Sequence, residues 1–325
     1  MPRFVRALSC VALLAFALAG AAVAGNGGVA PQAPASPTAG HIRDVYWLIL
    51  GITGGIFVLV TTTLVLFMVR YRSRGRPREV EGPQVRGHTN LELAWTAGPV
   101  IILAIIAGFV FWRVSDISDT KGASGATARE QIRVLGRQFY WEFTYPNGAI
   151  SVDHLRLPYN RAVRLQVVAG DVDHSWWVPA LGGKLDAIPG KTNHLTWRPT
   201  KLGTFRGQCA EFCGLLHAAM SAEVEVLPAN EYDSFVQQRK GDRMALGQET
   251  FVGVCAKCHG LAAQGGVGPS IASNPLLQDR NGLAKLLRNG GIQMPAVGKE
   301  WPDGQIDALR AYLKQRFGSS GGGQG

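Results

Sequence analysis

Residues 207–220, with the sequence GQCAEFCGLLHAAM, place two cysteines, one histidine and one methionine within fourteen positions. Cys209 and Cys213 are four residues apart, and His217 follows four residues later. Met220 comes three residues after the histidine. Thiolate, imidazole and thioether groups all serve as ligands for soft metals. Three interpretations are therefore open: a disulfide, a zinc site and a copper site.

The residue types favour copper. A disulfide between Cys209 and Cys213 would leave the histidine and the methionine of this segment without a role. Structural zinc prefers paired C-x-x-C ligands and has no use for methionine. A mononuclear blue-copper site needs two histidines, one thiolate and a weak methionine, so this segment has one thiolate too many. Two thiolates, two histidines and two weak ligands would instead hold two coppers that share one electron, and His174 is the candidate second histidine.

A second chemical motif, CAKCH at residues 255–259, is typical of covalent haem attachment. Cys255 and Cys258 would form the thioether bonds, and His259 would be the proximal iron ligand. Met294, 35 residues after that histidine, would be the sixth ligand, because a thioether sulfur stabilises ferrous iron. With both axial positions filled, this module would carry electrons and would not bind a substrate.

Apolar runs near the N-terminus indicate export and membrane insertion. Residues 1–24 have the basic start, apolar core and Ala-Val-Ala end of a signal peptide. Residues 25–40, rich in Gly, Ala and Pro, are expected to form a flexible exported segment. The runs at 45–69 and 93–112 are long enough to cross a bilayer. Between them, residues 70–87 carry six arginines and two glutamates, which predicts a cytoplasmic loop.

This transmembrane hairpin, residues 41–113 as a whole, places both chain ends outside the cytoplasm. We therefore expect a multi-pass protein of the bacterial inner membrane, with its large C-terminal part on the periplasmic face. The net charge of +10 arises largely in the arginine loop and the signal peptide. It indicates membrane topology, and nucleic acid is not an expected partner.

The exported part divides in two by its sequence pattern. Residues 129–228 alternate apolar and polar side chains between turns, which predicts a small antiparallel β-sandwich or barrel. Residues 229–242 have the pattern of a linker helix. Residues 243–318 predict a compact, mostly α-helical module, and the glycine-rich stretch at 319–325 predicts a disordered tail.

Together, the motifs LELAWT, GRQFYWEF, DVDHSWWVPALGGKLDAIPG, GQCAEFCGLLHAAM and CAKCH resemble subunit II of haem–copper cytochrome c oxidases. The resemblance spans nearly the whole mature chain and includes a class I cytochrome c domain fused at the C-terminus. It implies a multidomain fold: a two-helix transmembrane hairpin, an all-β cupredoxin-like Greek-key domain with a binuclear CuA centre, and an all-α cytochrome c domain. It also implies a function in which electrons pass from an external donor through haem c and CuA to a catalytic subunit. That subunit reduces oxygen to water with proton pumping.

The resemblance assigns a role to each residue of the copper segment. His174 and Met220 would complete one copper, and His217 and the backbone carbonyl of Glu211 would complete the other. The side chain of Glu211 would bind a magnesium ion shared with the catalytic subunit, although an exposed loop acid is the alternative interpretation. The full implied ligand set is His174, Cys209, Glu211, Cys213, His217 and Met220, with the two thiolates bridging both coppers.

Three more residues would act in electron or proton transfer. Glu92 in LELAWT matches the family's glutamate near the cytoplasmic mouth of a proton channel, although an acid at a helix end is the commoner case. Trp141 and Phe139 lie in the aromatic segment through which electrons would reach the copper. The family usually has tryptophan directly after Gln138, where this chain has Phe139. This departure fits an electron donor tethered to the same chain.

The implied partners are the membrane, the catalytic subunit I, subunit III and an external donor. The donor would be a cytochrome c, a copper protein or a bc-type complex. Two alternatives stay open: the equivalent subunit of a CuA-containing nitric oxide reductase, and a membrane-tethered copper or electron relay without a catalytic subunit. Glu92 and Glu211 fit proton uptake and a magnesium site, so they favour the oxidase.

Overall fold

The structure is a computed structural model that describes residues 31–72, 84, 86–117 and 130–318. The expected signal peptide and C-terminal tail lie outside the described residues, as does most of the arginine loop. The chain divides into two compact units. The described residues of the first unit are 31–33, 40–72, 84 and 86–117, and those of the second are 34–39 and 130–318.

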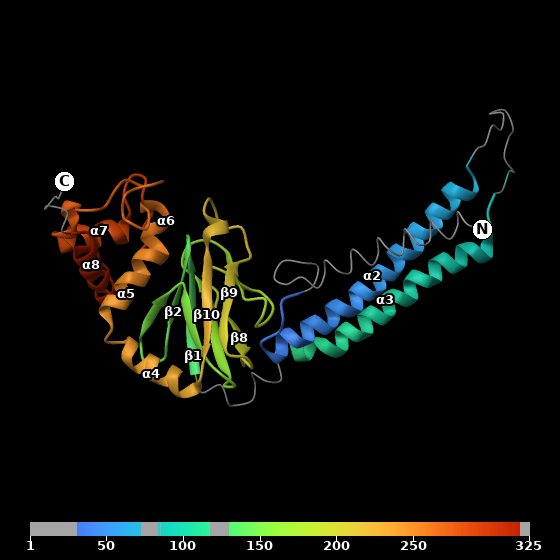
Figure 1. Cartoon of the computed structure of the whole chain (residues 1–325), viewed down its shortest axis with the longest axis horizontal. Coiled ribbons are helices and arrows are strands. Elements are labelled where there is room, and N and C mark those ends of the chain that lie inside the picture. The colour runs from blue at the N-terminus through green and yellow to red at the C-terminus, as the bar shows by residue number, and fades with distance from the viewer. Residues whose placement is uncertain (1–30, 73–83, 85, 118–129, 319–325) are drawn as a thin grey trace. The chain divides into compact units, whose positions relative to one another are not determined.

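Two long helices make up most of the first unit (Figure 1). Helix α2 spans Pro37–Arg70 and helix α3 spans Thr89–Ile117, so polar flanking residues extend both beyond the apolar runs. Both helices are long and apolar enough to cross a membrane, and most of their large apolar side chains are exposed. An ion pair of 3.2 Å between Arg113 and Asp44 joins the end of α3 to the beginning of α2, so the helices run antiparallel.

Residues just before the apolar part of α2 belong to the second unit. Ala35 donates its backbone N–H to the carbonyl of Ala180 over 2.7 Å, and Ser36 donates its hydroxyl to the carbonyl of Leu181 over 2.6 Å. Both Ala35 and Ser36 are buried. The sequence predicted flexibility throughout 25–40, and at these two residues that prediction is wrong because hydrogen bonds and burial hold the chain in place.

Two five-stranded sheets form a β-sandwich in the second unit (Figure 1). One sheet has the order β3-β2-β1-β5-β8, and the other has the order β4-β10-β9-β6-β7. Large apolar side chains fill the space between the sheets, among them Trp141, Phe143 and Trp176. The strands are β1 (Glu130–Arg137), β2 (Tyr140–Thr144), β3 (Ile150–Val152), β4 (His154–Pro158), β5 (Val163–Ala169), β6 (His174–Trp177), β7 (Leu185–Ala187), β8 (Asn193–Trp197), β9 (Gly203–Cys209) and β10 (Ser221–Leu227).

The pairing of the strands is mixed, whereas the sequence predicted an antiparallel arrangement. Strand β1 runs parallel to β5, with Glu130 opposite Val163, and β10 runs parallel to β4, with Glu223 opposite His154. The other pairs of named strands are antiparallel. Alternation of apolar and polar residues reports which face of a strand is buried and not the direction of its neighbour.

Helices follow the last strand. Helix α5 is capped at its N-terminus by Asp242, whose carboxylate accepts a hydrogen bond from the N–H of Ala245. Helix α8 packs so closely on α5 that a side chain at Gly247 would collide with the carbonyl of Ala308. The elements are α4 (Ala229–Arg239), α5 (Arg243–Thr250), the π-helical η2 (Phe251–Cys255), α6 (Ala256–His259), α7 (Arg280–Asn289) and α8 (Asp303–Phe317), with 3-10 turns η1 (His217–Ala219) and η3 (Pro275–Leu277).

Candidate metal centre and haem-attachment site

The two cysteines of the β-sandwich lie at the end of β9 and in the loop that follows it. Their sulfur atoms are 3.9 Å apart, compared with about 2 Å in a disulfide, so both are free thiols. Both side chains are buried. The loop turns back at Gly214, whose φ of +126° favours glycine, and a side chain there would collide with Gln138 and Phe139. The loop is therefore held against the start of β2.

Three further donor atoms surround the sulfur atoms. Nδ1 of His174 lies 3.9 Å from Sγ of Cys209. Nδ1 of His217 and Sδ of Met220 each lie 3.7 Å from Sγ of Cys213. The donor atoms of His174, Cys209 and Cys213 all lie within 4.8 Å of one another. The structure thus brings the two histidines, separated in the sequence, to the same pair of thiols.

Glu211 supplies one more oxygen to this cluster. The thiol of Cys209 donates a hydrogen bond to the backbone carbonyl of Glu211 over 3.1 Å, while the carboxylate side chain is exposed. Phe212 and Leu215 on the same loop are 78% and 85% exposed, which is unusual for large apolar side chains. The loop therefore presents an acid and two apolar groups on the outside of the candidate metal centre.

Asp171 orients the imidazole of His174, a role that the sequence motifs did not predict. The ring Nε2–H donates to the carboxylate over 2.8 Å, which leaves Nδ1 free to bind a metal. Burial opposes the charge on Asp171, but hydrogen bonds from His174 and from the N–H groups of Gln138 and Val172 lower its pKa overall. Burial lowers and Asp171 raises the pKa of His174, with a net increase. An acid three residues before the histidine was the available signal.

The environment favours a thiolate at Cys209. Burial opposes the charged form, but the adjacent imidazole of His174 and a hydrogen bond from the backbone N–H of Ser175 lower the pKa of this thiol to about 6. Burial and the neighbouring Cys209 raise the pKa of Cys213 to about 12, because two adjacent thiolates repel each other. A soft cation between the two sulfur atoms would offset this repulsion, since metal binding displaces thiol protons.

Aromatic residues at the start of β2 lie against the cluster. Trp141 is fully buried, with its ring centroid 6.0 Å from that of His174. Gln138 donates from its side-chain amide to the carbonyl of Cys213 over 2.6 Å. Phe139 packs on Gly214 and is only partly buried. Because Trp141 is enclosed by the sandwich, a separate protein could not contact it directly.

The CAKCH motif forms helix α6 and the turn before it. Cys255 and Cys258 are free thiols, and burial raises the pKa of Cys255 to about 12. Nδ1 of His259 donates to the carbonyl of Pro269 over 2.7 Å, which leaves Nε2 available as a metal ligand. Met294 is half-buried and packs on the helical core of the same module. These residues fit a covalently attached haem, because two thiols, an oriented imidazole and a thioether are present together.

Glu92 lies in the first turn of α3. Its carboxylate accepts a hydrogen bond from the N–H of His88 over 3.3 Å, and the side chain is exposed. Carboxylates in the first turn of a helix are stabilised by the helix dipole. This hydrogen bond caps the N-terminus of the helix. The proton-channel role of Glu92 stays a prediction.

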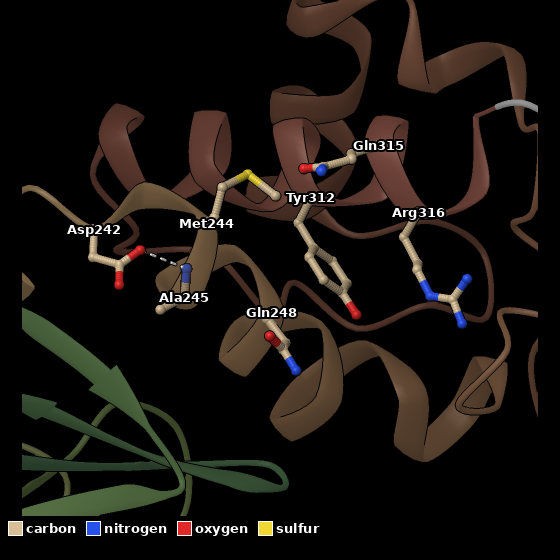
Figure 2. A pocket seen from close by; sticks show the side chains of 7 residues that line it. All are labelled: Asp242, Met244, Ala245, Gln248, Tyr312, Gln315 and Arg316. Carbon is tan, nitrogen blue, oxygen red and sulfur yellow. Dashed lines mark hydrogen bonds between the residues drawn. The ribbon is translucent and has the colours of Figure 1, made fainter.

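A hollow of about 530 Å³ lies between α5 and α8 in the helical module (Figure 2). It is lined by Asp242, Met244, Ala245, Gln248, Tyr312, Gln315 and Arg316. None of these residues belongs to the sulfur cluster or to the CAKCH motif, and Asp242 is already the cap of α5. The sulfur cluster and the CAKCH motif therefore lie away from this hollow.

Comparison with known proteins covers nearly the whole chain. The family described as "Cytochrome C oxidase subunit II, transmembrane domain" matches residues 24–112. The family described as "Cytochrome C oxidase subunit II, periplasmic domain" matches residues 148–227. The family described as "Cytochrome C oxidase, cbb3-type, subunit III" matches residues 242–313, which include the CAKCH motif.

Individual relatives give the same result. "Cytochrome c oxidase subunit 2" of Alkalihalophilus pseudofirmus is 33% identical over 86% of this chain and 89% of its own length. The protein of the same name from Bacillus sp. is 30% identical over 74% of this chain and 78% of its own length. The solved periplasmic domain of subunit II of cytochrome oxidase from Bradyrhizobium japonicum is 33% identical, over 35% of this chain and 95% of that domain, with a TM-score of 0.34.

Proposed function

Because this chain belongs to the cytochrome c oxidase subunit II family and carries a cytochrome c domain, we propose that it takes electrons from an external donor and delivers them to the catalytic subunit of its oxidase. The family and the fold class predicted from the sequence are confirmed. The chain is a membrane-bound subunit of an oxidoreductase complex. The observation that carries the proposal is the cluster of soft donor atoms around the thiols of Cys209 and Cys213.

In the proposed centre, the thiolates of Cys209 and Cys213 would hold both coppers. His174 and Met220 would serve one copper, and His217 with the carbonyl of Glu211 would serve the other. Such a copper pair, when bound, supplies a one-electron centre with small reorganisation. The buried sandwich excludes water from the sulfur atoms, and Asp171 keeps Nδ1 of His174 turned toward them.

The helical module is proposed to hold haem c, with Cys255 and Cys258 for its covalent attachment and His259 and Met294 as its iron ligands. The haem, when bound, supplies a one-electron carrier of raised potential. The carbonyl of Pro269 fixes the tautomer of His259, so Nε2 is the ring nitrogen that faces a metal. With His259 and Met294 both serving the iron, the module would carry electrons and would not bind substrate.

The remaining assignments concern partners. The exposed Phe212 and Leu215 beside the copper loop fit burial against subunit I, and the exposed carboxylate of Glu211 fits a magnesium ion at that contact. Subunit III is a further partner. Glu92 would lie at the mouth of a proton channel. The chain would reside in the bacterial inner membrane with its β-sandwich and helical module in the periplasm, while the partner subunit reduces oxygen and pumps protons.

The test is the metal content and electron paramagnetic resonance spectrum of the purified full chain with haem attached. We expect two coppers per chain with one shared unpaired electron in the oxidised protein. Cys209→Ser should lose that signal, whereas His194→Gln, a change of a histidine outside the cluster, should keep it. One copper per chain, or zinc in place of copper, would contradict the ligand assignment. The purified complex should consume oxygen, and consumption of nitric oxide alone would contradict the oxidase.

A further inference from the structure

The helical module and the β-sandwich share a buried contact within the second unit. The core of the helical module includes Tyr140 of β2 and Val152 of β3 beside its own Phe251 and Trp301. Neighbouring side chains of β2 lie on opposite faces of the strand. Trp141, the residue after Tyr140, therefore belongs to the core of the sandwich. The outward face of β2 and β3 is therefore covered by the helical module.

Lys257, the residue between the two cysteines of CAKCH, reaches across this contact. Its ammonium group donates to the backbone carbonyl of Phe139 and to the carboxylate of Asp153, both over 2.7 Å. The side chains of Lys257 and Asp153 are only 17% and 13% exposed. Exposed ion pairs contribute little, but this pair is largely removed from water and includes a backbone carbonyl. Breaking it would leave a buried charge without a partner.

Both residues that accept hydrogen bonds from Lys257 are linked to residues of the metal cluster. Phe139 follows Gln138, whose amide donates to the carbonyl of the ligand Cys213 over 2.6 Å. Asp153 accepts a hydrogen bond of 2.8 Å from the N–H of Trp141, and the ring of Trp141 packs edge-on against His174. The route through Phe139 and Gln138 thus connects the haem-attachment turn to the copper loop by hydrogen bonds and covalent bonds alone.

We propose that Lys257 is a positioning residue that holds the haem-attachment turn at a fixed distance from the copper centre and thereby sets the rate of electron transfer between them. This inference rests on the proposed function, which supplies the two redox centres. One electron moves from the helical module to the sandwich, so the first is oxidised and the second reduced by one electron. No bond forms or breaks.

The experiment uses the full chain in detergent, with haem attached and copper bound, and compares Lys257→Met with Lys285→Met. Lys285 is exposed on α7 and has no ion pair among the described residues, so the control loses the same charge from the same module. Hydrogen exchange is followed at Val152, whose N–H donates to Glu249 across the contact over 3.1 Å. The rate of intramolecular electron transfer is followed after a reducing light flash.

We expect Lys257→Met to raise exchange at Val152 by about tenfold or more, because truncating one partner of a buried charge pair typically costs more than a tenfold change in an equilibrium. Electron transfer should slow in the same variant, and Lys285→Met should change neither quantity. The midpoint potential of the haem is measured in each variant, so that a change in driving force is not mistaken for a change in position.

Lys257→Gln is the second variant, in case Lys257→Met fails to receive haem, because it loses the charge that faces Asp153 while its amide can still donate to the carbonyl of Phe139. Faster exchange and slower electron transfer in either variant support the proposal. If both quantities are unchanged, or if only one of them changes, the proposal is overturned. Absence of the shared-electron copper signal in the unmodified chain would instead contradict the proposed function.

Discussion

At the scale of single residues, the copper cluster depends on how its histidines are oriented. A histidine ring can present either nitrogen, and the hydrogen bond at one nitrogen selects the other for metal binding. Asp171 makes this selection for His174 by accepting from Nε2. The same carboxylate accepts from the N–H of Gln138, whose side chain bonds to Cys213. Asp171 therefore connects His174 and Cys213, two residues of the proposed copper centre.

Replacing Asp171 with asparagine should weaken copper binding by about 10- to 100-fold, as is typical when the partner of a metal-bound histidine is changed. Competition with a chelator, followed through the copper resonance signal, measures this affinity. Asp173→Asn is the matched control, because Asp173 is an exposed acid next to His174. Equal losses of copper affinity in the two variants would show that negative charge near His174, and not the orientation of its imidazole, sets the affinity.

At the scale of elements, strand β2 serves two cores. Trp141 and Phe143 face the interior of the sandwich, while Tyr140 and Glu142 contact the helical module. Side chains of a strand alternate between its two faces, so one short strand can take part in both. The hydroxyl of Tyr140 donates to the carbonyl of Val297 over 2.7 Å and accepts from the indole N–H of Trp301 over 3.1 Å.

Tyr140→Phe should destabilise the docked helical module by about 1–3 kcal/mol, because it leaves a buried indole N–H and a carbonyl without partners. Thermal unfolding of the haem-loaded chain, followed by haem absorbance, gives the change in stability. Tyr159→Phe, at a partly exposed tyrosine of the sandwich, should stay within about 0.5 kcal/mol. A loss no larger than that of the control would mean that the Tyr140 bonds are not needed for docking.

At the scale of the whole second unit, the contact between modules contains several buried acids. Burial raises the pKa of Glu142, of Glu249 and of Asp153, and for Asp153 it reaches about 6 in spite of Lys257. A groove of about 760 Å³ runs beside this contact and is lined by both Asp153 and Lys257. The acids are therefore held in place by packing at some cost to their ionised forms.

This arrangement predicts a pH dependence with a definite sign. The pKa of Asp153 is higher in the folded chain, about 6, than its ordinary value of 3.8, so the folded state binds more protons between these values. Stability from this group is then full below pH 3.8 and falls as the pH rises through 6. Unfolding of Asp153→Asn between pH 4 and 7 should lack this decrease. An identical pH profile in both proteins would contradict it.

The chemical motifs could be predicted from the sequence because their donors are close along the chain. Cys209, Cys213, His217 and Met220 fall within one loop and one turn, and the three haem-binding residues of CAKCH fall within five positions. Apolar runs and arginine content likewise predicted two membrane helices, which depend on local composition alone.

Tertiary structure decided what lies between these motifs. The parallel pairing of β1 with β5, the burial of Trp141 and the orientation of His174 by Asp171 depend on packing that local patterns do not encode. The bond from Lys257 to Asp153 joins residues 104 positions apart. Sequence therefore determined which donor groups this chain offers to a metal or a haem. Folding determined how the two centres are placed, because contacts between distant segments form only when both modules are packed.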